Sequence, residues 1–284
     1  ETLAQDNRQM ARMRRREMLT DLLLGRCTEE TQCRKQLANM EIEPAASYAA
    51  AVVLIDDFGT FSREHSVQDL ALFRYAAANI AEELLADCGR AYCAEMDSDQ
   101  IAVLLCLNAN APDSRECFAH LCAAVQEHLH KTVTCGIGGQ VTVLTELVTS
   151  YNRAMTAAGY RLVQGCGSVI DYHDIAARQT LTPEYPLDTD AAIVQALRSR
   201  SAAKAEEELD SFFAHFALAN IDSINMATTQ LAISLSRTVH SMAAVHEGTR
   251  QLPNYRVVSG ALAGCDTLEQ RKAVLKEYCG RVIE

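Results

Sequence analysis

The sequence lacks three features, and each absence excludes a class of protein. It has no apolar run of membrane-spanning length and no signal peptide, so no spanning helix is predicted. Its 26 Lys and Arg against 37 Asp and Glu give a formal net charge of -11 at pH 7, which argues against broad nucleic-acid binding through a basic face. It contains no Cys-x-x-Cys and no histidine at zinc-ligand spacing from paired cysteines. No metal site or cofactor is therefore expected.

The residues that are present predict a globular chain. Its 284 residues, 49% of them hydrophobic, are enough for one large or two ordinary domains with real cores. The eleven cysteines are odd in number and lie inside apolar segments, as Cys106, Cys117, Cys122 and Cys135 do. We therefore predict buried free thiols rather than a disulfide scaffold.

The most informative stretch is an expected hairpin. Residues 91–95 form its first strand, and residues 96–100 supply Asp and Ser side chains that favour a turn. Residues 101–107 are a continuous apolar run of buried-strand length. Upstream lie another apolar strand at residues 50–58 and a long helix at residues 67–87, so the order of elements is β-α-β-β.

These elements resemble a GGDEF-type nucleotide cyclase domain over about residues 47–172. The likeness is carried by Ile-Asp-Asp-Phe at residues 55–58, the helix after it, and the hairpin that runs into Ile-Ala-Val-Leu-Leu. The five signature positions fall on residues 97–101, which keep the central Asp99 and an apolar fifth residue. Both glycines and the Glu are missing, and the sequence thus looks like the degenerate GGDEF-like domain of membrane-anchored AraC-type transcription regulators.

The resemblance implies that catalysis is lost. Signature glycines let the backbone close on the nucleotide, whereas Asp97 and Ser98 carry a Cβ there. The metal-binding positions of the family map to Leu54 and Asp99, and a leucine is no ligand for a hard cation. Gln100 replaces the signature Glu and cannot ionise to act as a general base. We therefore expect no enzyme activity and no catalytic residue.

Two acidic residues are kept as ligand-binding candidates. Asp56 and Asp99 would contact a nucleotide or cyclic dinucleotide if the degenerate pocket served as a receptor without turnover. The adjacent pair Asp56 and Asp57 is interpreted as a solvated turn rather than a metal site, because neighbouring strand residues point to opposite faces. Gly-Ile-Gly-Gly at residues 136–139 lacks the Lys-Ser/Thr ending of a P-loop, and a strand end followed by a turn is predicted.

The N-terminal segment leaves two interpretations open. Residues 1–24 form an expected helix with an apolar stripe, ended by Gly25. Leu3, Met10 and Leu22 are candidates for a parallel helix pair across a homodimer, and the alternative is packing of the helix against its own domain. Residues 1–46 are predicted to form an N-terminal signalling helix and a short helix. The GGDEF-like domain is predicted to follow at residues 47–178.

The C-terminal part is predicted to be all helical. Two prolines within residues 180–188 mark a domain boundary, and residues 189–284 form a helical linker domain without a helix-turn-helix. The predicted fold class is therefore α/β, with a mixed and mainly antiparallel cyclase-like sheet, followed by an all-α domain. Its helices are expected at residues 190–200, 202–219, 223–246 and 267–283, with interruptions at residues 252–254 and 260–264. Asp222 and Ser223 are expected to cap one helix, and another carries the apolar stripe Leu209, Phe212, Phe213 and Phe216.

The resemblance implies a regulatory role in a longer protein. We expect a non-catalytic cytoplasmic fragment of a cell-membrane protein that relays a sensor signal through dimer rearrangement. DNA would be bound only by a domain absent from this chain, and the membrane would be reached through a missing N-terminal segment. The alternative is a receptor for a nucleotide or cyclic dinucleotide.

Overall fold

The computed structural model describes residues 2–108, 113–245 and 255–283. The chain divides into two compact units, Glu1–Ile175 and Ala176–Glu284, and each is described by itself. The predicted boundary segment, residues 180–188, falls in the second unit. Among the residues that the structure describes, no helix combines the length and the apolar character needed to span a bilayer.

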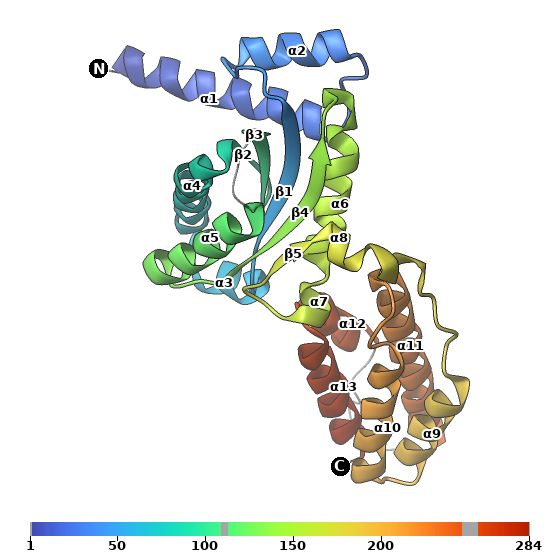
Figure 1. Cartoon of the computed structure of the whole chain (residues 1–284). Coiled ribbons are helices and arrows are strands. Elements are labelled where there is room, and N and C mark those ends of the chain that lie inside the picture. The colour runs from blue at the N-terminus through green and yellow to red at the C-terminus, as the bar shows by residue number, and fades with distance from the viewer. Residues whose placement is uncertain (1, 109–112, 246–254, 284) are drawn as a thin grey trace. The chain divides into compact units, whose positions relative to one another are not determined.

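The first unit is built on a five-stranded mixed sheet in the order β2-β3-β1-β4-β5. The neighbouring strands are antiparallel except for β4 and β5, which are parallel. Helices lie on both faces, with α6 on one and α4 and α5 on the other (Figure 1). This sheet, followed by a helical unit, confirms the predicted fold class. The strands are β1 (Ser47–Ile55), β2 (Gly89–Asp97), β3 (Gln100–Leu107), β4 (Val133–Val141) and β5 (Val169–Asp171).

The helices of the first unit arise where apolar residues recur at helical spacing behind a cap. The helix predicted at residues 67–87 is observed at Val67–Leu84, and a capping box between Ser66 and Asp69 fixes its start. The short helix at Phe58–Glu64 was not predicted, and it begins after Asp57, whose φ is 50°. The helices are α1 (Thr2–Leu23), α2 (Glu30–Asn39), α3 (Phe58–Glu64), α4 (Val67–Leu84), α5 (Ser114–Leu129), α6 (Leu147–Gly159), α7 (Arg161–Gln164) and α8 (Tyr172–Ile175).

Each face of the sheet has its own core because strand side chains alternate between the faces. On one face Val52 and Leu54 pack with residues of α1, α2 and α6. On the other face Val53 and Ile55 pack with residues of α3, α4 and α5. All nine residues of β1 are buried, so β1 is the centre of the unit.

Two glycines of β4 allow α6 to lie close to the sheet. A Cβ at Gly138 would come within 1.7 Å of the Ser150 carbonyl oxygen, and one at Gly136 within 2.2 Å of the Ala154 carbonyl oxygen. The Ser150 hydroxyl also donates to the Gly139 carbonyl at 2.6 Å. The strand continues to Val141, so the predicted strand end and turn at residues 136–139 is wrong, and these glycines serve helix packing.

The C-terminal half of α1 packs against its own domain. Leu19, Leu22 and Leu23 are each at most 2% exposed and lie in the same core as Leu54. The chain leaves α1 through Gly25 with φ at 68°, as the sequence predicts for a stop at this glycine. Leu22 is therefore buried by its own domain, and in this arrangement it cannot contact a second chain. The side chains of Leu3 and Met10 lie outside what the structure describes.

One prediction about the cysteines is wrong. Cys88, just after α4, and Cys117 of α5 are joined by a disulfide that spans 29 residues of sequence. They meet because α4 and α5 pack side by side on one face of the sheet. Cys106, Cys122 and Cys135 are free and buried, as predicted. The Cys122 and Cys135 sulfurs are 3.5 Å apart, and the Cys122 contact, with burial, raises the pKa of the Cys135 thiol.

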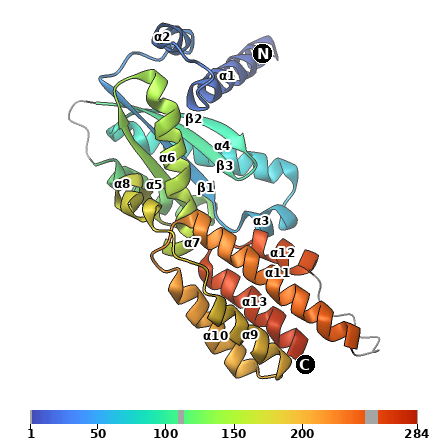
Figure 2. The same cartoon turned by 90° about the vertical axis from the view of Figure 1, so that its right-hand side faces the viewer.

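The second unit, drawn at the bottom of Figure 2, is a helical bundle in which α10 packs against α9 and α13, and α11 packs against α9 and α12. Its core includes the predicted stripe of Leu209, Phe212, Phe213 and Phe216, all buried. The Asn220 side chain, rather than Asp222, caps α11 by accepting a bond from the Ser223 amide at 2.7 Å. The helices are α9 (Leu187–Arg198), α10 (Ala202–His215), α11 (Ile221–Val245), α12 (Tyr255–Ala263) and α13 (Leu268–Ile283).

Helix α12 was not predicted. The glycines at residues 260 and 264 suggested an interruption, yet Gly260 lies inside the helix and Gly264 just after it. Val258 and Leu262 are buried, and this packing outweighs the low helix propensity of glycine. The other predicted interruption, residues 252–254, lies outside the described residues.

Candidate functional site

The degenerate signature lies on the tight turn between β2 and β3. Asp97 pairs with Gln100 across the hairpin, and a register shift falls between Glu95 and Asp97. Asp97 and Ser98 are exposed, whereas Asp99 is half-buried. The Asp99 carbonyl accepts a bond from the Ile55 amide at 2.8 Å, which ties the turn to the end of β1. The resemblance and the structure therefore place these positions at the same end of the sheet as Asp56.

An arginine of α4 holds the turn from one side. The Arg74 guanidinium donates to the Glu95 carboxylate at 3.1 Å and to the Ser98 carbonyl at 3.0 Å. The Arg74 and Glu95 side chains are 17% and 29% exposed, so solvent weakens this pair less than a fully exposed one. The hairpin thus has a fixed position relative to α4.

A tyrosine of α6 holds the turn from the other side. The Gln100 side chain is 5% exposed, and its amide donates to the Tyr151 hydroxyl. Burial raises the pKa of Tyr151, so its hydroxyl stays protonated near neutral pH. The fourth signature position therefore carries a neutral buried amide that takes part in packing, and it supplies neither a base nor an exposed acceptor.

The mapped metal-ligand position is enclosed by apolar side chains. Leu54 is 8% exposed and pairs in register with Gln100 on one side and Thr134 on the other. It belongs to the core that includes Leu19 and Leu22 of α1. A divalent cation prefers oxygen ligands, and Leu54 provides none. The residues present do not fit the metal that the resemblance would place here.

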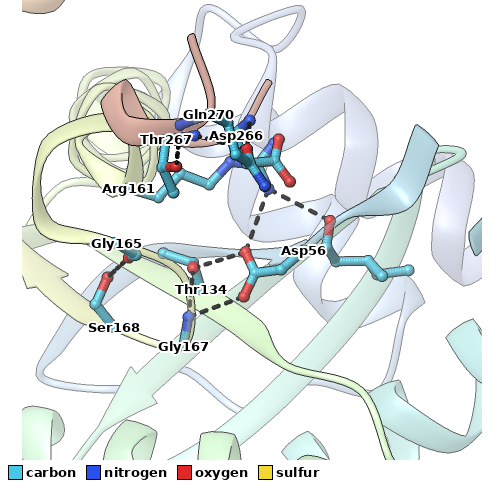
Figure 3. A network of polar contacts seen from close by, with 10 residues as sticks. Asp56, Thr134, Arg161, Gly165, Gly167, Ser168, Asp266, Thr267 and Gln270 are labelled. Carbon is cyan, nitrogen blue, oxygen red and sulfur yellow. Dashed lines mark hydrogen bonds and ion pairs between the residues drawn. The ribbon is translucent and has the colours of Figure 1, made fainter. Parts of the chain in front are cut away.

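Asp56 lies in a network of polar contacts at the end of β1 (Figure 3). It is 1% exposed, so the prediction that it forms part of a solvated turn is wrong. Its carboxylate accepts bonds from the Thr134 hydroxyl at 2.8 Å and the Gly167 amide at 2.9 Å. The Arg161 guanidinium lies 3.4 Å from it. These donors surround the carboxylate, which joins β1 to β4 and to the loop before β5.

Asp56 and Asp99 lie on opposite sides of β1. The Asp56 amide donates to the Thr132 carbonyl next to β4, whereas Asp99 bonds the Ile55 amide from the side of β3. Within the residues that the structure describes, no hydrogen bond or ion pair joins the two carboxylates. The two ligand-binding candidates are therefore near neighbours along the edge of the sheet, but they do not converge on one point.

Sequence reasoning missed the residues that hold this region together. Arg74 and Tyr151 fix the turn, and Thr134 and Arg161 satisfy Asp56. The one available signal was Gln100, a polar residue directly before an apolar strand, which needs a buried partner. That signal could not identify Tyr151, which is 51 residues away in the sequence.

The comparison with protein families detects a GGDEF-like domain at residues 24–160. This match begins directly after α1 and ends directly after α6, so it contains the hairpin, Leu54 and Asp56. A search of curated proteins finds no match. The first unit thus carries a GGDEF-like domain with a cyclase-like fold, and the C-terminal helical unit lies beyond the matched residues.

Proposed function

We propose that this chain is a non-catalytic signal-relaying module of an AraC-type transcription regulator. The observation that carries the proposal is the burial of Gln100 against Tyr151 beside Leu54. In an active cyclase the position of Gln100 would supply the base and that of Leu54 a metal ligand. Here both side chains are buried and take part in the packing. A GGDEF-like domain followed by a helical unit is the arrangement that the resemblance implies for such regulators.

The contacts of α1 support a relay through the hairpin. The Arg15 guanidinium lies over the Tyr92 ring, 4.8 Å from its centroid, and the Thr20 hydroxyl oxygen lies 3.5 Å from the Met96 sulfur. Met96 directly precedes the signature turn. A shift of α1 would therefore act on β2 and on the turn, which is also tied to α4 and α6. In this proposal the relay carries an input at α1 to the helical unit and to a DNA-binding domain outside the chain.

Backbone amide exchange tests the relay. Leu22→Ala removes a fully buried contact of α1, which costs about 2–5 kcal/mol in packed cores. We expect faster exchange in β2 and at residues 97–100, by about tenfold or more relative to the amides of β4. Met13→Ala, at a side chain of α1 that is 62% exposed, is the matched control and should leave these rates unchanged.

Two outcomes would contradict the proposal. If Leu22→Ala accelerated exchange only within α1, the helix would not be coupled to the hairpin. If β4 changed as much as β2, the variant would report general destabilisation rather than a defined path. Either result would remove the support that the α1 contacts give to a relay.

A further inference from the structure

The second unit has a groove that the proposed relay does not use. It is about 830 Å³ in volume and lies between α11 and the start of α9. Its α11 side consists of adjacent pairs of residues that recur every four positions from Asn225 to Thr238. At 1.5 Å of rise per residue, this stripe is about 20 Å long. Its length and open side suit an extended occupant, since small ligands are usually enclosed over most of their surface.

The hydroxyl groups of the stripe can lose water at little cost. The Thr229 hydroxyl donates to the Asn225 carbonyl at 2.9 Å, and the Thr238 hydroxyl to the Ser234 carbonyl at 3.1 Å. The Ser234 hydroxyl donates to Asp190 at 2.8 Å. Because these hydroxyls already have acceptors, covering them leaves no new unsatisfied donor. Met226, which is 70% exposed, adds apolar surface to the same groove.

The groove also contains one acidic and one basic residue that are not paired with each other. Asp190 accepts bonds from Tyr185 and Ser234, both neutral hydroxyls. Arg237 is exposed, and within the described part of the chain no hydrogen bond or ion pair involves it. Asp190 is bonded to Ser234, which lies one helical turn before Arg237. The charges of Asp190 and Arg237 therefore lie near each other along the groove, but they do not pair. The surface is therefore complementary in charge to a second copy of itself.

We propose that this groove binds α11 of a second copy of the chain in a two-fold symmetric, antiparallel contact. In such an isologous pair, Arg237 of each copy faces Asp190 of the other, so one contact supplies both missing counter-charges. The recurrence every four residues makes a ridge of side chains that can pack into the matching groove of the partner helix. This inference deepens the proposed function, because it names a surface through which a dimer would transmit a change.

The expected strength of the contact follows from its size. A pair of helices over about 20 Å buries less than the roughly 800 Å² per partner of a standard stable interface. We therefore expect a reversible dimer. In light scattering, the mass of the whole chain should rise from 31.1 kDa toward twice that value as its concentration increases over about 1–100 µM.

Charge reversal gives the direct test. Arg237→Glu places like charges opposite Asp190 at both equivalent contacts, and the dissociation constant should rise about tenfold or more. Arg198→Glu makes the same charge change on an exposed residue of α9 and should leave the dissociation constant unchanged. Met226→Asp should also weaken the dimer, and circular dichroism would establish that each variant remains folded.

Two results would overturn the inference. A wild-type chain of 31.1 kDa at every concentration would show that the groove does not bind a second copy. A dimer that Arg237→Glu and Met226→Asp leave intact would place the contact elsewhere, for example at α1. Neither result bears on the exchange test of the relay, because that test follows α1 and β2 within one chain.

Discussion

At the scale of single residues, Asp56 illustrates how a carboxylate at a strand end can serve structure. Its sequence context, Ile-Asp-Asp-Phe, resembles a strand motif of the GGDEF family whose metal-binding first acid is replaced here by Leu54. In this chain its oxygens accept bonds from Thr134 and Gly167, and Arg161 lies beside them. A ligand at Asp56 would have to displace these donors. Asp99, by contrast, is half-buried and holds the turn through its backbone carbonyl.

Removing the two carboxylates should therefore have different effects on stability. Asp56→Ala leaves buried donors without their acceptor and should lower the free energy of unfolding by about 3 kcal/mol. Asp99→Ala should change it by less than about 0.5 kcal/mol. Urea denaturation followed by circular dichroism measures both values. Equal losses, or a larger loss for Asp99→Ala, would contradict the structural role assigned to Asp56.

At the scale of elements, the disulfide joins the segment after α4 to α5. Cys88 and Cys117 are 0% and 6% exposed, so the bond lies within the core on that face of the sheet. Closing a loop that spans 29 residues restricts the unfolded chain, and such a cross-link contributes about 3–4 kcal/mol. The disulfide thus stabilises the pair of helices that covers this face.

Reduction of the Cys88–Cys117 disulfide should reveal how much it contributes to stability. With dithiothreitol, the urea midpoint of the wild-type first unit should fall by an amount equivalent to about 3 kcal/mol. A variant with Cys88→Ala and Cys117→Ala should not respond to the reductant, which controls for effects of dithiothreitol on the remaining thiols. If all eleven cysteines of the untreated, urea-unfolded protein reacted as free thiols, the disulfide would be refuted.

The elements also show which features can be predicted from a sequence. Helical spacing and local caps are contained within a few residues, so α4 and the hairpin could be predicted close to their observed ends. The Cys88 to Cys117 bond and the Gln100 to Tyr151 contact span 29 and 51 residues. Such pairs depend on how the helices pack on the sheet. The sequence therefore revealed which cyclase groups are missing, but not what replaces them.

At the scale of the whole molecule, the chain combines a GGDEF-like domain with a helical unit. The hairpin that would hold nucleotide in a cyclase is fixed by Arg74 and Tyr151 and is in contact with α1 through Met96. In the proposed relay this hairpin is a mechanical contact, and the groove along α11 would join two copies of the chain. The proposed relay requires that the degenerate site neither binds nor converts nucleotide.

Calorimetry of the purified chain with GTP and with cyclic di-GMP, each with and without Mg²⁺, tests that requirement most directly. The same samples are then analysed for cyclic dinucleotide product. We predict no heat of binding for either ligand and no product, because Leu54 and Gln100 supply neither a metal ligand nor a base. Binding at micromolar strength that Asp99→Ala or Asp56→Ala abolishes would contradict the relay account and favour a nucleotide receptor. Formation of product would contradict the proposal that the domain is non-catalytic.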